Sequence, residues 1–237
     1  MKKLLIAGVI LICIICTSLV GLSIYLVQKY KPTTNSNTTK EDLKELKSIQ
    51  NGRKGFSLSP KSFSADDFNN FYKITSESGE IVSWAGDLQE LENETKTPFQ
   101  TIKNAEKYKL VPIIQTTVYQ QSSGKFLRPL DSETIANYKN YSIEFVKKYK
   151  PLYFGLGIEV NVMYEKSPAD FEKFVVFFNE LAETVKTESP DTRVFTTFQL
   201  EHMKGLKGGL FGGKNDTKLS QWSLIEKFTN ADLIAFT

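Results

Sequence analysis

Residues 154–161 read Phe-Gly-Leu-Gly-Ile-Glu-Val-Asn, a short apolar run that carries a single acidic side chain. The composition is typical of a buried β-strand, and a buried strand seldom includes a carboxylate that has no use. In proteins that alternate strands with helices, catalytic and binding residues gather at the carboxyl ends of the strands. Glu159, which lies at that end of the run, is therefore the first candidate for a functional residue.

Strand and helix patterns alternate on both sides of this run. Strands are expected at 55–59, 80–84, 110–118, 153–160, 193–200 and 232–236, and helices at 65–74, 98–108, 132–149, 167–187 and 219–228. Strands that are separated by helices predict parallel βαβ units. The first strand is not followed by a Gly-rich fingerprint, which disfavours a doubly wound nucleotide-binding sheet.

The length of this alternating region favours an incomplete (β/α)8 barrel, the TIM-barrel type of α/β fold. Such barrels typically take about 250 residues, whereas the alternation extends only from Gly55 to Thr237. About six of the eight βα units fit into that length, and the last residues lie within an expected strand. We therefore expect a barrel domain over 51–237 that lacks its seventh and eighth strands.

The first thirty residues have a different character. Residues 4–27 contain no charge, with Thr17, Ser18 and Ser23 as their polar side chains. A membrane-spanning helix needs roughly 20 apolar residues, whereas a cleaved signal has an apolar core of about 7–15. We favour a single uncleaved transmembrane anchor over 1–30, with a cleaved secretory signal as the alternative. Residues 31–50 then form a polar tether and a lead-in helix, and the barrel is expected outside the cytoplasm.

Charge and cysteine placement limit the classes of function. The chain has 30 basic and 27 acidic residues, and four of the basic ones, at positions 2, 3, 29 and 31, flank the apolar segment. The remainder carries a net charge of −1, which is no electrostatic signature for nucleic acid. Cys13 and Cys16 lie inside the apolar segment and are interpreted as small apolar side chains rather than as a redox or metal motif. No cofactor and no metal are expected.

Alternation along the 153–160 strand divides its side chains between two faces. Glu159 and Asn161 share one face with Gly155 and Gly157, while the large apolar side chains take the other face and are expected to pack against helices. Glu159 and Asn161 would then lie together at the rim of the barrel. A partly desolvated carboxylate at that place suits general acid/base chemistry. The alternative is a structural Glu that is hydrogen-bonded to neighbouring strands.

Four segments resemble the retaining glycoside hydrolase barrels of clan A, nearest to the arabinogalactan endo-β-1,4-galactanases of family 53. They are 55–60 (GFSLSP), 83–88 (SWAGDL), 155–161 (GLGIEVN) and 232–237 (DLIAFT). The resemblance implies a (β/α)8 fold, hydrolysis of β-linked polysaccharide, and Glu159 as the general acid/base at the end of the fourth strand.

Two features depart from the pattern of that clan. The clan usually has Asn directly before the acid/base Glu, where this sequence has Ile158, so Asn161 is the residue that could take over the sugar contact. The clan's nucleophile is a Glu that ends the seventh strand, and only six strands are expected here. Because retaining hydrolysis needs two carboxyl groups about 5–5.5 Å apart, this chain by itself is expected to be inactive.

Further polar and aromatic residues near expected strand ends could line a sugar-binding cleft. They are Trp84, Asp87, Tyr119, Gln199 and Glu201. Trp84 could stack on a pyranose ring or belong to the core. Asp87 and Glu201 are candidates for a second carboxylate, and otherwise solvated loop residues or helix caps. His202, the only histidine, is expected in an exposed loop, and the glycine-rich run 208–213 is interpreted as a rim loop rather than a phosphate-binding loop.

Two functions therefore stay open. The first is a membrane-anchored, extracytoplasmic glycoside hydrolase that acts on β-linked polysaccharide, with Glu159 as acid/base. The second is a non-catalytic barrel that binds surface glycan or another envelope component, in which Glu159 is structural or contacts the ligand. Both imply a glycan and the membrane as partners, and neither implies nucleic acid.

Overall fold

A computed structural model describes residues 52–62, 64–208 and 213–237. The expected membrane anchor over 1–30 and the expected tether and lead-in helix over 31–50 lie outside the described residues. Among the helices that are described, none combines the length and the apolar character that crossing a membrane requires.

The described residues form a six-stranded, fully parallel sheet whose strand order follows the sequence, β1-β2-β3-β4-β5-β6. The strands are β1 (Gly55–Ser57), β2 (Ile81–Asp87), β3 (Val111–Thr117), β4 (Tyr153–Leu156), β5 (Arg193–Phe198) and β6 (Leu233–Phe236). Each strand pairs in parallel with the next one along the chain. This sequential order is that of a barrel rather than of a doubly wound sheet, which would reverse direction partway.

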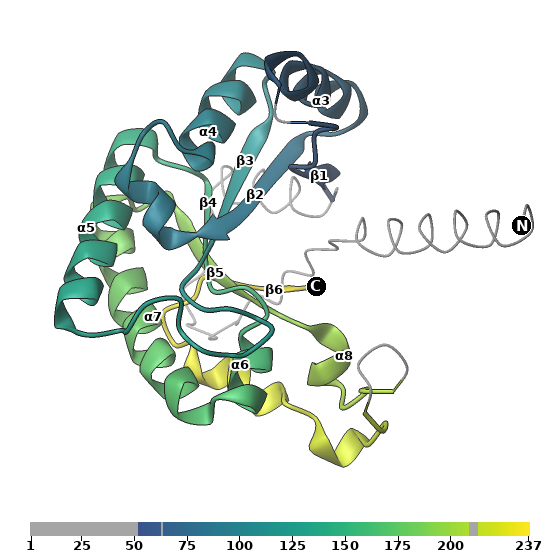
Figure 1. Ribbon diagram of the computed structural model, residues 1–237, viewed down its shortest axis with the longest axis vertical. Coiled ribbons are helices and arrows are strands. Elements are labelled where there is room, and N and C mark those ends of the chain that lie inside the picture. Colours follow the sequence, from purple (N-terminus) through teal and green to yellow (C-terminus); the bar gives the residue numbers. More distant parts are fainter. Residues whose placement is uncertain (1–51, 63, 209–212) are drawn as a thin grey trace, which may run out of the picture.

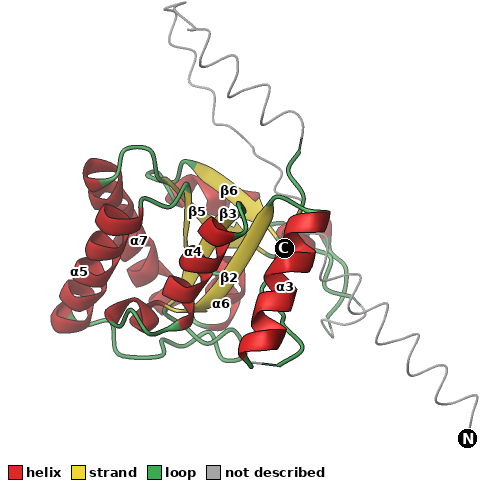
Figure 2. Cartoon of the chain, turned by 90° about the horizontal axis from the view of Figure 1, so that it is seen from above, coloured by secondary structure: helices red, strands yellow, loops and turns green. Residues whose placement is uncertain are grey.

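Helices and short 3-10 turns connect the strands. They are α3 (Ala65–Ser78), η1 (Leu88–Glu92), α4 (Thr97–Lys107), α5 (Ser132–Tyr149), α6 (Val160–Lys166), α7 (Pro168–Glu188), α8 (Leu200–Met203), η3 (Thr217–Leu219) and η4 (Trp222–Lys227). In Figure 1, α3, α4, α5 and α7 form an arc around one side of the strands, and Figure 2 gives the view from above. Six parallel strands with alternating helices on the outside fit a partial TIM barrel, which confirms the coarse fold expected from the sequence.

Local sequence signals account for where several helices begin. Ser64 caps α3 by accepting a hydrogen bond from the backbone N–H of Asp67, and Asp131 caps α5 in the same way through Thr134. The carboxylate of Asp131 thus satisfies a free N–H group of the first turn, and Ser132 is the first residue of the helix. A proline opens both α4 and α7, where its missing N–H costs nothing.

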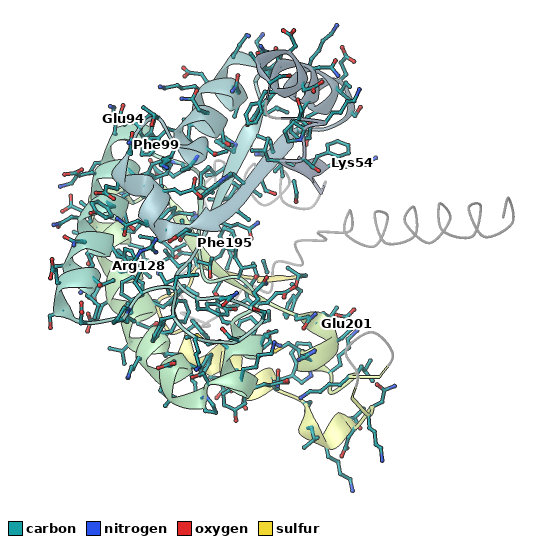
Figure 3. The ribbon with its side chains drawn as sticks, in the orientation of Figure 1. Lys54, Glu94, Phe99, Arg128, Phe195 and Glu201 are labelled. Carbon is teal, nitrogen blue, oxygen red and sulfur yellow. The ribbon has the colours of Figure 1, made fainter. Side chains whose placement is uncertain are left out.

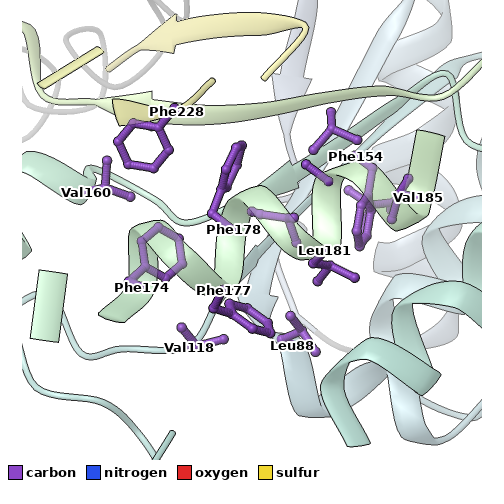
Figure 4. Close-up of a cluster of buried hydrophobic side chains, with 14 of the residues drawn as sticks. Leu88, Val118, Phe154, Val160, Phe174, Phe177, Phe178, Leu181, Val185 and Phe228 are labelled. Atoms are coloured by element: carbon purple, nitrogen blue, oxygen red, sulfur yellow. The ribbon is translucent and has the colours of Figure 1, made fainter. Parts of the chain in front are cut away.

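Two apolar layers stabilise the sheet, one on each face. The helix-facing layer is rich in aromatic side chains from α7, including Phe174, Phe177 and Phe178, which Figure 4 shows beside Phe154 and Phe228. The layer on the inner face of the sheet is smaller and consists of buried Ile81, Ile113, Phe195 and Ala235. The inner layer leaves room for polar side chains toward the carboxyl ends of the strands.

Three expected elements differ from the structure. The strand expected at 153–160 ends at Leu156, and residues 160–166 form the short helix α6 instead. The helix expected at 219–228 consists of two 3-10 segments, η3 and η4. The strand expected at 193–200 ends at Phe198, and the chain turns directly into α8. Two of these differences lie at the carboxyl end of the sheet, where the candidate site is.

Candidate functional site

The chain leaves the sheet sharply after β4. Gly157 has a φ of 83° and Glu159 has φ 58° and ψ 47°, so both adopt left-handed backbone conformations, and α6 begins at Val160. The N–H of Gly157 still donates to the carbonyl of Thr116 at 2.8 Å, which is the last β3 contact made by this segment. Glu159 therefore lies on a turn between strand and helix, rather than on the strand where alternation predicted it.

The left-handed conformation of Glu159 is not explained by the end of a helix or by a glycine. Glycine adopts it freely, whereas other residues do so rarely. The other two such residues in the described chain, Lys109 and Lys150, directly follow or end a helix, where this conformation is common. Glu159 instead precedes a helix. Strained residues of this kind cluster at functional sites, so the observation singles out Glu159 independently of its charge.

Two hydrogen bonds hold the strained turn. The N–H of Glu159 donates to Oγ1 of Thr197 on β5 at 2.7 Å, and the hydroxyl of Tyr119 donates to the carbonyl of Ile158. Tyr119 is 1% exposed. Burial, with a further contribution from the nearby Glu159 carboxylate, raises the pKa of the Tyr119 hydroxyl above its ordinary range. The hydroxyl thus stays protonated and can act as a permanent donor to the turn.

The Glu159 carboxylate has two hydrogen-bond donors, each from an exposed segment. Nε2 of Gln121 donates to Oε2 at 2.9 Å, and Oγ1 of Thr237 donates to Oε1 at 2.8 Å. Gln121 belongs to the segment between β3 and α5, which Lys166 of α6 holds by donating to the carbonyls of Gln121 and Ser122, at 2.9 Å each. The carboxylate is half-buried and is oriented by hydrogen bonds from two separate parts of the chain.

Gly157 is required for this arrangement by space as well as by conformation. A Cβ atom at this position would lie 2.5 Å from Cγ1 of Val160 and 2.6 Å from Cζ of Phe174. We therefore expect Gly157→Ala to lower the free energy of unfolding by about 2–4 kcal/mol, from backbone strain and overpacking together. Denaturant unfolding measures the loss.

Gly52→Ala is the matched control, because Gly52 also has a positive φ but nothing lies within 4 Å of its missing Cβ. An equal loss of unfolding free energy in both variants would mean that the close packing at Gly157 does not contribute to the effect of Gly157→Ala. Unfolding of Gly157→Ala at the wild-type denaturant concentration would contradict the assignment of a tight turn.

Asn161 is fully buried and not at the rim. Its Nδ2 donates to the carbonyl of Gln199 and to Oε1 of Gln221, at 3.0 Å each, and its Oδ1 accepts from the N–H of Gln199 at 2.8 Å. These bonds tie the first turn of α6 to the segment that follows β5. Because α6 begins one residue after Glu159, Asn161 fixes the helix that carries the turn. Gln199 takes part in these bonds through its backbone carbonyl and N–H.

A polar cluster continues from Asn161 along α6, and it was not anticipated from the sequence. Glu165 accepts hydrogen bonds from Gln221, from Nδ1 of His202 at 3.1 Å and from Nζ of Lys207 at 2.5 Å. Burial opposes ionisation of Glu165, but the bond from Lys207 and the proximity of His202 outweigh it and lower the pKa of the carboxyl. His202 is buried in α8, so the expectation of an exposed loop histidine is wrong.

The remaining candidates are spread over the structure. Trp84 is 5% exposed and belongs to the helix-facing core with Leu88. Asp87 caps η1 through the N–H of Gln89 and forms an ion pair with Arg128, at 2.8 Å between Oδ2 and Nη2. Glu201 is exposed on α8. Figure 3 places Arg128 well apart from Glu201, and Asp87 is paired with Arg128.

The structure therefore brings only part of the predicted set together. Glu159, Tyr119, Asn161 and the backbone of Gln199 share one linked arrangement at the ends of β3, β4 and β5. Trp84 and Asp87 are engaged elsewhere. Within the described ranges, no group of three or more His, Cys, Asp or Glu side chains is placed to hold a metal ion.

The sequence offered little signal for the residues that complete the site. Thr197 follows the strand alternation of β5 and could have been proposed from its strand-end position. Gln121, Lys166 and Thr237 lie on connecting segments or at the edge of an element, and nothing in their sequence context places them beside Glu159.

No family model and no curated protein sequence matches this chain. Solved structures with a similar arrangement include an exo-β-1,4-mannosidase, Op5Man5, from Opitutaceae bacterium strain TAV5 (TM-score 0.48, 13% identity, 72% of this chain and 35% of that chain covered). The spore cortex-lytic enzyme SleL of Bacillus cereus has a TM-score of 0.48 and 12% identity, with 75% of this chain and 39% of that chain covered.

A D-psicose 3-epimerase in the presence of D-fructose is also similar (TM-score 0.41, 8% identity, 71% of this chain and 56% of that chain covered). Glycoside hydrolases with a TIM-barrel-like fold are thus among the structures that the chain resembles, and sugar epimerases are as well. The chain spans from 35% to 56% of the length of these three proteins. No similar structure gives specific support for family 53.

Proposed function

We propose that this chain belongs to a glycoside hydrolase-like protein that acts on β-linked polysaccharide outside the cytoplasm, with Glu159 as the general acid/base. The apolar segment over 1–30 would anchor it to the membrane. Family 53 endo-β-1,4-galactanases are the nearest pattern on which the proposal draws, through the 155–161 segment that contains Glu159.

The observation that carries the proposal is the turn that presents Glu159. A carboxylate stands at the carboxyl end of the fourth of six sequential parallel strands, in a left-handed conformation that non-glycine residues rarely adopt. Two parts of the chain, the segment after β3 and Thr237, donate hydrogen bonds to the turn or to its carboxylate. Strained and fixed acidic groups at this end of a barrel are typical of catalysis.

The surroundings of the carboxylate suit an acid/base role. The amide of Gln121 and the hydroxyl of Thr237 both donate hydrogen bonds to it. Each donor lies on an exposed segment, so a sugar hydroxyl can take its place when substrate binds.

The nucleophile is the missing part of a retaining mechanism. Among the described residues, the hydrogen-bond partners of the Glu159 carboxylate are an amide and a hydroxyl. Asp87 is engaged by Arg128, and Glu201 is exposed on α8. We infer that retaining hydrolysis needs a second carboxylate from outside the described residues, and that the 237 residues alone bind glycan without hydrolysing it.

A non-catalytic glycan-binding barrel is the second candidate. It is favoured because the described partners of the Glu159 carboxylate are an amide and a hydroxyl rather than a second carboxylate. A single carboxylate without a second one beside it can accept hydrogen bonds from sugar hydroxyls but cannot complete retaining hydrolysis. The two candidates make different demands on the coding sequence after Thr237. The hydrolase requires a further strand that ends in Glu, whereas a stop codon at that place leaves only the binding function.

The experiment that tests the hydrolase is digestion of β-1,4-galactan, β-1,4-xylan and mixed-linkage β-glucan by the protein translated from the complete reading frame. New reducing ends are measured over time, and proton NMR reports the anomer that forms first. We expect release of products with retained configuration from one of the three. Inversion of configuration would contradict the paired-carboxylate mechanism, and the absence of products would leave the binding role as the better description.

A further inference from the structure

One polar side chain on the inner face of the sheet stands apart from its neighbours. The inner layer at this level is apolar, with Ile113 and Phe195 as buried members. Gln115 follows Ile113 by two residues on β3, so it points to the same face. It is 5% exposed. A glutamine amide is therefore placed in the interior of the half-barrel.

This amide is not used by the protein. Within the described residues, the side chain of Gln115 makes no hydrogen bond, although it is nineteen-twentieths buried. The neighbouring polar groups do have partners. The hydroxyl of Thr116 donates to the carbonyl of Gly155 at 2.9 Å, and Oγ of Ser83 donates to Oγ of Ser57 at 3.2 Å. Gln115 is not among the described residues whose fully buried side-chain atoms lack a partner, so its amide reaches the open inner side of the half-barrel, where a ligand can bond to it.

Small residues keep the space beside Gln115 open. The strand register pairs Gln115 with Ala85 on β2 and with Gly155 on β4. A Cβ atom on Gly155 would lie 2.8 Å from Cζ of Phe195 and 3.2 Å from Cα of Gln115, so the ring of Phe195 extends over Gly155. Figure 3 labels Phe195 in the middle of the sheet. The amide is thus flanked by a methyl group, a glycine and the surface of an aromatic ring.

The same strand links this place to Glu159. Gly155, the β4 partner of Gln115, precedes Glu159 by four residues, which span at most about 14 Å of chain. Gln115 lies deeper in the half-barrel and Glu159 lies at its rim. A ligand held by Glu159 can therefore extend a group down to the amide. The aromatic ring of Phe195 beside Gly155 offers an apolar surface on which the C–H face of a sugar can rest.

We propose that Gln115 is a ligand-contacting residue that hydrogen-bonds two adjacent hydroxyl groups of a pyranose ring bound next to Glu159. The amide carries one acceptor and two donors, which matches a pair of neighbouring hydroxyls, each of them both donor and acceptor. This inference rests on the proposed function, since it assigns the inner part of the same glycan site. It makes Gln115, rather than the buried Trp84 or Asn161, the residue that selects the ring.

The test uses the 237-residue chain and three probes: β-1,4-galactotetraose, xylotetraose and cellotetraose. Binding is measured by titration calorimetry for the wild type, for Gln115→Met, which keeps the size but removes the amide, and for Gln100→Met on α4 as the control. We expect one probe to bind the wild type and the control equally and Gln115→Met at least about tenfold more weakly. The thermal midpoint of Gln115→Met is expected to stay unchanged, because the amide makes no hydrogen bond within the described protein that the substitution would remove.

The outcomes distinguish a failure of the role of Gln115 from a failure of the glycan site at Glu159. Equal binding by Gln115→Met and the wild type overturns the role of Gln115 and leaves Glu159 untouched. A thermal midpoint that falls by several degrees in Gln115→Met, with binding lost in proportion, overturns it as well, because the amide would then be structural. If none of the three probes binds the wild type, both the glycan site and the role of Gln115 are wrong.

Discussion

Glu159→Gln is expected to lower the turnover of β-linked polysaccharide by about 10²- to 10⁴-fold in the protein that carries the second carboxylate, the range that loss of a general acid/base produces. The amide has the size of the carboxylate and can still accept the hydrogen bond from Thr237 through its oxygen. Its nitrogen would face Nε2 of Gln121, so two donors would meet where a donor now meets an acceptor. The new amide has no acidic proton that it could give to a leaving group.

The matched control is Glu201→Gln on α8, which removes the same charge from an exposed position near the same end of the sheet. Its turnover is expected to stay within twofold of the wild type. Kinetics on the substrate that the wild type cleaves best, with oligosaccharide binding measured in parallel, distinguish the loss of chemistry from the loss of binding. Undiminished turnover by Glu159→Gln would remove this residue from the mechanism.

The sequence predicted the order of elements well, because that order follows from local hydrophobic patterns. The strand expected at 110–118 corresponds to β3 at Val111–Thr117, and the 132–149 helix has the bounds of α5. Amphipathic helices and apolar strands can be recognised from the hydrophobic pattern of their own residues. A sheet of parallel strands in sequential order then follows from the βαβ alternation.

The exit from β4 could not be predicted in the same way. Apolar and polar residues keep alternating through Val160, so the pattern alone extends the strand. What ends it is tertiary: Gly157 bonds back to Thr116, and the N–H of Glu159 bonds to Thr197 on β5. Asn161 therefore turns into the protein rather than toward the rim. The strand-end rule still identified Glu159, because the rule depends on topology and not on strand facing.

Side-chain partners across loops were the least predictable part. Gln121 reaches Glu159 over a sequence separation of 38 residues, and Thr237 over 78. Neither has a local pattern that identifies it. Trp84 was ambiguous between the cleft and the core for a related reason, since its facing depends on which side of β2 the helices cover. It shares that side with Val82, which packs beneath α3 and α4.

Phe178→Ala is expected to lower the free energy of unfolding by about 3–5 kcal/mol, the range for truncation of a fully buried phenylalanine. Phe178 is fully buried on α7. Its ring lies edge-on to that of Phe228 at 5.0 Å between centroids and 6.3 Å from that of Phe174. Figure 4 shows these rings between α7 and the strands.

Val176→Ala on the same helix is the control, because Val176 is 59% exposed and its truncation removes little buried surface. Chemical denaturation followed by circular dichroism measures both variants, and a loss below about 1 kcal/mol in Phe178→Ala would contradict the close packing of this cluster.

The consequence of Phe178→Ala extends beyond stability, because the same aromatic cluster supports the turn at Glu159. Phe174 packs against Gly157, with 2.6 Å between its Cζ and the position of the absent Cβ, and it also contacts Phe178 and Phe228. A cavity at Phe178 allows Phe174 to move away from Gly157 and relaxes the constraint that keeps Glu159 left-handed. We therefore expect Phe178→Ala to weaken oligosaccharide binding even at temperatures where the variant is fully folded, whereas Val176→Ala should bind as the wild type does.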